Sequence, residues 1–97
     1  MRSYVILVNW TDHGAKNSRD TLKRAKDFGA LIESRGGTVR EHLYTLGEYD
    51  MITVAEFPDD ATAAAAVLTL SSLGNVRAKT MRAFTDEETA AIIAQLG

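Results

Sequence analysis

The amino-acid sequence predicts an α+β domain in which helices cover one face of a four-stranded antiparallel sheet. Three observations predict it: apolar runs of strand length, amphipathic runs of helix length, and glycine, proline or capping residues between them. The runs follow one another in the order β-α-β-β-α-β-α. A chain of 97 residues has the ordinary size of one domain. We therefore expect residues 1–97 to form a single domain.

The first part of the chain predicts a strand, a loop and a helix. Residues 3–9 are rich in β-branched and aromatic side chains, as is typical of a buried strand. Residues 10–17 break this pattern and are expected to form a loop. Ser18 can cap a helix that runs to about Arg35 and that Gly36-Gly37 ends. The apolar arc of this helix consists of Leu22, Ala25, Phe28, Gly29 and Ile32.

The middle of the chain predicts a β-hairpin. Residues 38–46 and residues 50–57 are both patterned as strands, and only the short turn 47–49 separates them. Pro58 stops the second strand because proline has no N–H to donate to a neighbouring strand.

One strand and two helices complete the chain. Asp59 can cap a helix over residues 61–72, which Gly74 ends. Residues 75–84 are patterned as a fourth strand. The segment Thr85–Glu88 then fits a capping box, which starts a final helix.

The first six elements match the ferredoxin-like βαββαβ arrangement, and the last is an added C-terminal helix. The strand Tyr4–Val8 is apolar on both sides, so the sheet face without helices needs a cover. Either the last helix or a second subunit supplies it. A chain of this length buries only roughly two-thirds of its unfolded surface, so a partner adds useful stability. We expect a homodimer or higher homo-oligomer, with a free monomer of low stability.

Composition excludes several classes of function. The net charge of −2 argues against nucleic-acid binding, which needs a concentrated basic surface, and against charge-driven binding to an anionic membrane. No segment approaches the roughly 20 apolar residues that span a bilayer. The absence of cysteine excludes disulfides, thiolate metal sites and a cysteine nucleophile. The first residues lack the apolar run of a signal peptide, so we expect a cytoplasmic protein.

Several short motifs, in the right order, resemble the GYD domain family. Its hallmark is a Gly, a Tyr and an Asp at a hairpin, which Tyr44–Asp50 contains. The segment Asp12-His13-Gly14 is similar to the family's loop after the first strand. Further segments that resemble the family are Glu56–Asp60, Gly74–Arg77 and Arg82–Thr85. The resemblance spans nearly the whole chain and implies a ferredoxin-like fold of the dimeric α/β-barrel kind. It implies little about activity.

Tyr49 and Asp50 are the first candidates for chemistry. A carboxylate beside a phenol at the mouth of a cavity can bind a polar ligand, or the two can act as acid and base. The alternative is a turn, in which Gly47 supplies unusual backbone angles and Asp50 accepts hydrogen bonds from loop amides. The turn is the more frequent use of these residue types.

The two histidines, His13 and His42, are candidates for ligand binding, and His13 also for proton transfer from a mobile loop. With carboxylates from other elements they can in principle form a two-histidine, one-carboxylate metal site. Their spacing matches no short metal motif, and we expect neither a metal nor a cofactor. The strand neighbours with which His42 alternates are Val39, Glu41 and Leu43. We expect the His42 side chain to point away from theirs.

Trp10 and Arg82 complete the set of candidate ligand-binding residues. Trp10 ends the first strand and can line a ligand pocket with its N–H as a polar handle, or it can anchor the core or an interface. Arg82 can hold a carboxylate or a phosphate. Its alternative role is an ion pair with Glu56 or Asp50, either within the chain or between subunits.

No motif in the sequence specifies a reaction. The first hypothesis is a homo-oligomeric module that binds a small molecule in a cavity between sheet and helices. The second is a cofactor-independent enzyme of oxygenase, isomerase or decarboxylase type, by analogy of fold alone. It requires that a pocket be shared by at least two of His13, His42, Tyr49, Asp50 and Arg82. The third is a structural or interaction protein without a ligand.

Overall fold

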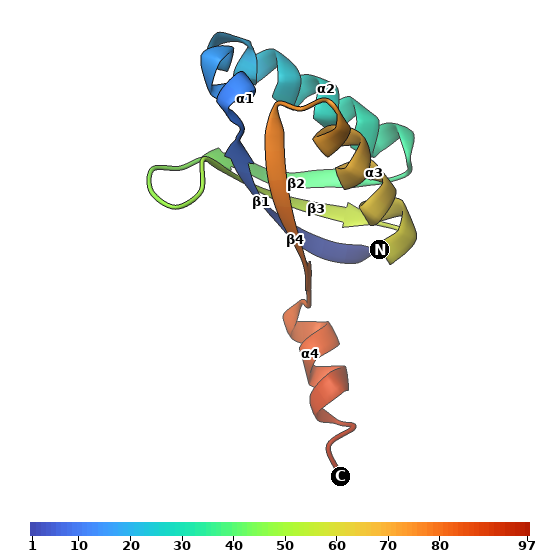
Figure 1. The fold of residues 1–97 in the computed structure, drawn as a ribbon. Helices are drawn as coiled ribbons and strands as arrows, with labels where there is room; N and C mark the ends of the chain where they lie inside the picture. Colours follow the sequence, from blue (N-terminus) through green and yellow to red (C-terminus); the bar gives the residue numbers. More distant parts are fainter.

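The computed structural model describes residues 1–97 and has the predicted α+β architecture (Figure 1). Its strands are β1 (Arg2–Trp10), β2 (Thr38–Tyr44), β3 (Met51–Phe57) and β4 (Val76–Ala83). They form one antiparallel sheet in the order β2-β3-β1-β4. Its helices are α1 (Asp12–Lys16), α2 (Thr21–Ser34), α3 (Asp60–Ser72) and α4 (Asp86–Ile93). The ferredoxin-like βαββαβ order with an added C-terminal helix is therefore confirmed.

Most element ends lie where the sequence predicts them. The Asp59 carboxylate caps α3 by accepting a 2.8 Å hydrogen bond from the Thr62 N–H. Thr85 and Glu88 form the predicted capping box at the start of α4. Gly36 follows the end of α2 with a φ of +81°, a conformation that L side chains rarely adopt.

The loop predicted for residues 10–17 is wrong, because Asp12–Lys16 within it fold into the short helix α1. The Thr11 hydroxyl oxygen caps this helix by accepting from the Gly14 N–H, and the hydroxyl itself donates to the Gly74 carbonyl at 2.6 Å. Gly14 packs so closely on the chain before β4 that a Cβ at this position would lie 1.9 Å from the Asn75 carbonyl oxygen. A glycine is therefore required where α1 meets the start of β4.

The predicted start and apolar arc of α2 need correction. Ser18 does not cap α2 but opens a 3₁₀ turn, Ser18–Asp20, and α2 begins at Thr21 without a side-chain cap. The buried face of α2 is centred on Phe28, so that Leu22 lies about 120° away from it on the helix and is 73% exposed. Leu31 packs against the core instead.

The orientation predicted for His42 is correct for two of its three neighbours. A β-bulge between Val39 and Glu41 shifts the register of β2 against β3. Val39 pairs with Ala55 and His42 with Thr53, so Val39 and His42 share the sheet face under the helices. Glu41 and Leu43 lie on the other face, as predicted.

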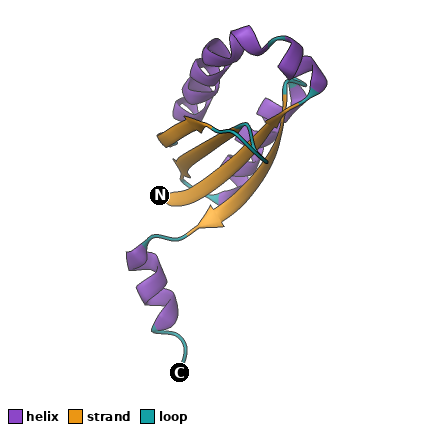
Figure 2. Cartoon of the chain, turned by 90° about the vertical axis from the view of Figure 1, so that its left-hand side faces the viewer, coloured by secondary structure: helices purple, strands orange, loops and turns teal.

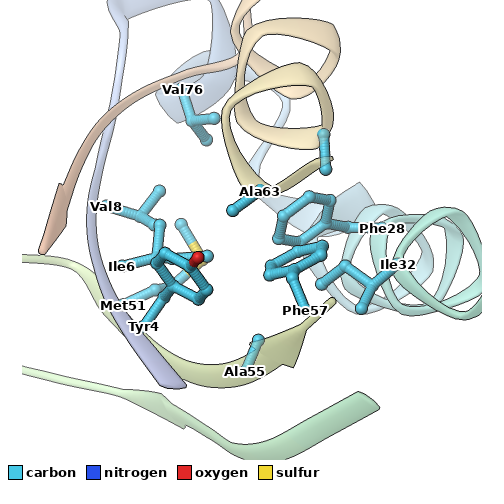
Figure 3. Packing of buried hydrophobic residues seen from close by; sticks show 11 residues of the cluster. Tyr4, Ile6, Val8, Phe28, Ile32, Met51, Ala55, Phe57, Ala63 and Val76 are labelled. Atoms are coloured by element: carbon cyan, nitrogen blue, oxygen red, sulfur yellow. The ribbon is translucent and has the colours of Figure 1, made fainter. Parts of the chain in front are cut away.

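The core lies between the sheet and helices α2 and α3. Alternate residues of the two central strands supply one side of it, and Figure 3 shows Tyr4 and Ile6 on the same side as Met51 and Phe57. The helices close it with the buried residues Phe28, Ile32, Ala63 and Ala66. The alanines leave room for the aromatic rings beneath them, including the edge-to-face pair of Tyr4 and Phe57 at 5.6 Å.

The opposite face of the sheet has no cover within the chain. Its apolar residues are Val5, Leu7, Leu43, Ile52, Val54 and Met81, which we call the open face. Figures 1 and 2 both show α4 standing away from the sheet, and no residue of α4 is buried. The last helix therefore does not cover this face. No helix combines the length and apolarity needed to cross a membrane.

Candidate functional site

A cavity of about 480 Å³ lies between the sheet and the first half of α2, at the end of the sheet where β1 finishes and β3 and β4 begin. Its walls are mostly apolar. Side chains that form them include Val8, Ala25, Phe28, Met51, Leu70 and Val76. A concave, largely apolar space of this volume with a few polar groups is the usual form of a small-molecule site.

The cavity exists because α2 and α3 fit the sheet differently at its two ends. At the far end, Ile32 of α2 and Ala63 of α3 are fully packed against the core. At the cavity end, α3 finishes at Ser72, and the next residue, Leu73, is 65% exposed rather than inserted between the layers. The side chains at this end leave the space between sheet and helices unfilled.

Trp10 lines the cavity from the end of β1, and Asp50 fixes its backbone. The Asp50 carboxylate accepts a 2.9 Å hydrogen bond from the Trp10 N–H, and the Asp50 N–H donates to the Val8 carbonyl at 3.0 Å. The indole nitrogen Nε1 is sealed from solvent and has no hydrogen-bond partner. A buried N–H without an acceptor is costly, and in a cavity wall it is a point at which a ligand gains affinity.

His42 lines the same cavity from β2. Its Nδ1 lies 2.7 Å from Oγ1 of Thr53, and its ring meets the Tyr44 ring edge-to-face at 5.0 Å. Nε2 is buried without a partner. Burial lowers the pKa of His42 below its ordinary value, so the imidazole is neutral at pH 7.

Arg24 and Thr53 also belong to the cavity, and neither is among the residues that the sequence singles out. Thr53 is buried, and the strand pattern around it does not distinguish it from its neighbours. The Arg24 guanidinium donates to the carbonyls of Asn17 and Gly14, and so ties α2 to the end of α1. The helical wheel could have identified Arg24 as a cavity residue, because Arg24 lies close to Phe28 on it.

Tyr49 and His13 lie outside this cavity. Tyr49 lines a separate, more polar hollow together with Asn9 and Lys79, whose Nζ is 5.8 Å from the Tyr49 ring centroid. His13 is exposed on α1, and its carbonyl accepts a hydrogen bond from the Asn17 side chain. Asp50 does not line the cavity and is joined to its wall by hydrogen bonds to the backbone of Trp10 and Val8.

Arg82 lies at the opposite end of the sheet, paired in register with Tyr4. The predicted ion pair with Glu56 or Asp50 is wrong within the chain. Arg82 pairs with Glu88 at 3.1 Å and approaches Asp60 at 4.0 Å, because α4 and the first turn of α3 are the acidic elements beside it. Asp60 also accepts a hydrogen bond from the Tyr4 hydroxyl, and burial together with this carboxylate raises the pKa of Tyr4 to about 12.

The structure thus brings Trp10 and His42 together in one cavity and disperses the other candidates. The enzyme hypothesis requires at least two of its five candidate residues in one pocket, and only His42 lines the cavity. No group of three or more His, Asp or Glu side chains is arranged to hold a metal ion.

Comparison with known proteins assigns the family. The family model described as GYD domain matches residues 4–93. The chain belongs to the GYD domain family. It is also 34% identical over 84 residues to a protein of Thermus thermophilus named "Glutamine synthetase and cystathionine beta-lyase binding protein". The alignment covers 86% of this chain and 88% of that relative.

The residues of the GYD hallmark build the hairpin loop that supports the cavity. Gly47 has a φ of +121°, which only glycine adopts without strain. Thr45 closes the loop, because its N–H donates to the Asp50 carbonyl and its hydroxyl donates to the Tyr49 carbonyl. Asp50 then joins the loop to β1 at Trp10. In this GYD domain, Gly47 supplies the unusual backbone angle expected of it, whereas the Asp50 carboxylate accepts from the Trp10 N–H of β1 and not from an amide of the loop.

The lowered pKa of His42 predicts that the folded protein loses stability as the pH falls from about 6.5. Both states are neutral at this residue above that pH. Below it the unfolded chain binds a proton and the folded chain does not, until the lower folded pKa is reached. Urea denaturation between pH 7.5 and pH 5 measures this decline.

The His42→Asn variant removes the titrating ring, so it is expected to lose most of this decline in stability. The His13→Asn variant, altered on the exposed surface of α1, serves as the control and is expected to keep it. An unchanged pH dependence in His42→Asn contradicts the assignment.

Proposed function

We propose that this protein is a homodimeric module that binds a small molecule in the cavity lined by Trp10 and His42. The observation that carries the proposal is the pair of sealed, unpartnered ring nitrogens in the wall of an otherwise apolar cavity. In this proposal the whole chain, residues 1–97, acts as one domain. The binding role is favoured over catalysis because the acid–base candidates lie apart.

The dimer part of the proposal rests on the open face. Val5, Leu7, Ile52 and Val54 form a contiguous apolar area on the two central strands, and Leu43 and Met81 extend it to both edges with exposures of 55% and 48%. An uncovered apolar sheet face is typical of an interface. A second copy of this chain offers the same face, and a two-fold axis buries both at once.

Ligand uptake is testable with the chain's single tryptophan, because Trp10 lies in the cavity wall. In a thermal-shift screen of small aromatic metabolites, a ligand at one hundred times its Kd stabilises the folded state by about 2.7 kcal/mol. We expect such a compound to raise Tm by several degrees and to change the Trp10 emission.

Ala25→Phe fills the cavity from α2, and we expect it to abolish both responses. Ala30→Phe, on the exposed side of the same helix, is the matched control and is expected to retain them. A library without a single stabilising compound, or hits that bind Ala25→Phe as tightly as the parent, argues against a ligand site.

The dimer is testable by sedimentation velocity at micromolar concentration. We expect the parent protein to sediment as a dimer and Val54→Glu to sediment as a folded monomer. The new carboxylate lies in the middle of the open face, beside Glu41 on the neighbouring strand, and burying it without a partner is strongly unfavourable. Leu22→Glu makes the same kind of change on the exposed surface of α2 and should leave the dimer intact. A well-folded monomer of the parent protein refutes the proposal.

A second candidate function is binding to an enzyme, and the name of the Thermus relative favours it. Helix α4 and the residues after it provide an available surface, because Ile92 and Ile93 of the helix and Leu96 beyond it are exposed, and the helix stands away from the rest of the chain (Figure 1). An apolar helix side presented in this way is a common means of docking onto a larger protein.

Biolayer interferometry with purified glutamine synthetase and cystathionine β-lyase from the organism that encodes this chain tests the second candidate. If α4 docks, Ile93→Asp should weaken binding at least about tenfold, because an apolar contact is replaced by a buried charge. Leu68→Asp changes an equally exposed apolar residue on α3 and should have little effect. No binding of either enzyme by the parent protein excludes both as partners.

A further inference from the structure

The two unpartnered ring nitrogens define what the cavity can recognise. The indole Nε1 of Trp10 carries a hydrogen and can only donate. The role of Nε2 of His42 depends on which ring nitrogen carries the proton, and this follows from the contact at the other nitrogen.

Thr53 determines the tautomer of His42. Its hydroxyl is buried, with a residue exposure of 1%, and its hydrogen bond is to Nδ1 of His42. If Nδ1 donated to this oxygen, the hydroxyl hydrogen would remain buried without an acceptor. With the hydroxyl donating to Nδ1, the hydroxyl and Nδ1 both have a partner. The imidazole proton then resides on Nε2. The cavity wall therefore carries two neutral N–H donors, one on Trp10 and one on His42.

The charged groups near the cavity are already engaged. Arg24 donates to the carbonyls of Asn17 and Gly14. The Asp27 carboxylate pairs with Lys23 at 3.3 Å, and its side chain is 67% exposed. Arg24 therefore has no carboxylate partner, whereas Asp27 has one cationic partner. A cationic ligand would thus lose its hydration in an apolar cavity without gaining a free counter-charge, which is strongly unfavourable.

We propose that the cavity selects a mainly apolar ligand of aromatic size, without a positive charge, whose carbonyl-type oxygens accept hydrogen bonds from Trp10 Nε1–H and His42 Nε2–H. The proposal rests on the proposed function, because it specifies the ligand class of the same cavity. Neither nitrogen touches solvent in this structure. The proposal therefore includes a rotation of the two rings, by which these nitrogens come to face the ligand.

A matched pair of probes tests the need for an acceptor. 2-Acetylnaphthalene and 2-ethylnaphthalene have nearly the same shape, and only the first carries a carbonyl oxygen. We expect isothermal titration calorimetry to show the ketone binding about tenfold more tightly, as one buried hydrogen bond provides. The parent protein should also show its single indole N–H resonance moving downfield in ¹H–¹⁵N NMR spectra with the ketone and not with the hydrocarbon.

Variants assign the preference to the two rings. Trp10→Phe and His42→Phe keep a ring and remove the donor, so each should reduce the ratio of the two affinities, and the double variant should bring it close to one. Leu70→Val changes the apolar wall and should weaken both probes together while the ratio persists. The NMR measurement on the parent protein keeps the test decisive if a variant fails to fold.

Each outcome separates this proposal from the proposed function. Equal affinity of the two naphthalenes for the parent protein overturns the acceptor requirement but leaves a ligand cavity in place. Tighter binding of 2-naphthylmethylammonium than of the ketone overturns the exclusion of a positive charge. If no naphthalene binds, the ligand class proposed here is wrong, and the metabolite screen decides separately whether the cavity binds a small molecule.

Discussion

The hydrogen bond from the Trp10 N–H to the Asp50 carboxylate is the contact on which the arrangement of the site depends. It joins the end of β1 to the hairpin loop, and the Asp50 N–H adds a second link to Val8. Strand β1 lies between β3 and β4 in the sheet, so the position of its end also sets where the neighbouring strands begin. The residues of the family hallmark thus support the cavity indirectly. They build the loop that holds Trp10 and do not themselves line the cavity.

The helices pack closely on the sheet at one end and loosely at the other, and this difference explains the remainder of the structure. Where α3 is built from alanines, the rings of Phe28 and Phe57 fill the space beneath the helices and produce a closed core. Where α3 ends, no large side chain replaces them, and a cavity remains. The energetic cost of this arrangement is visible in the two sealed nitrogens of Trp10 and His42. Such a cost is expected where a structure keeps room for a ligand, since packing alone would favour a filled core.

The sequence predicted the fold well because local signals determine it. Glycine, proline and capping residues mark the ends of most elements, and the βαββαβ order leaves few alternative topologies. The short helix α1 was missed because its stabilising contacts come from far along the chain, at Gly74 and Asn75. The bulge at β2 was missed because no residue near Arg40 announces it, and it changed which neighbours share a face with His42.

The site was less predictable because it depends on contacts between residues that are far apart in the sequence. Trp10 and His42 were identified by residue type, and their meeting in one cavity depends on the pairing of β2, β3 and β1, which no local pattern encodes. Arg82 was matched to the wrong carboxylates because its partner Glu88 lies on a helix whose direction follows only from the three-dimensional structure. Thr53 became informative only through its contact with His42.

The central claim is that the space beside Trp10 and His42 is a ligand site. A crystal structure of the protein soaked with 2-acetylnaphthalene tests it most directly. The account predicts electron density for the naphthalene rings between α2 and the sheet, with the carbonyl oxygen at hydrogen-bonding distance from Trp10 Nε1 or His42 Nε2. Side chains that close over an empty space, or a probe bound only elsewhere on the surface, would contradict it.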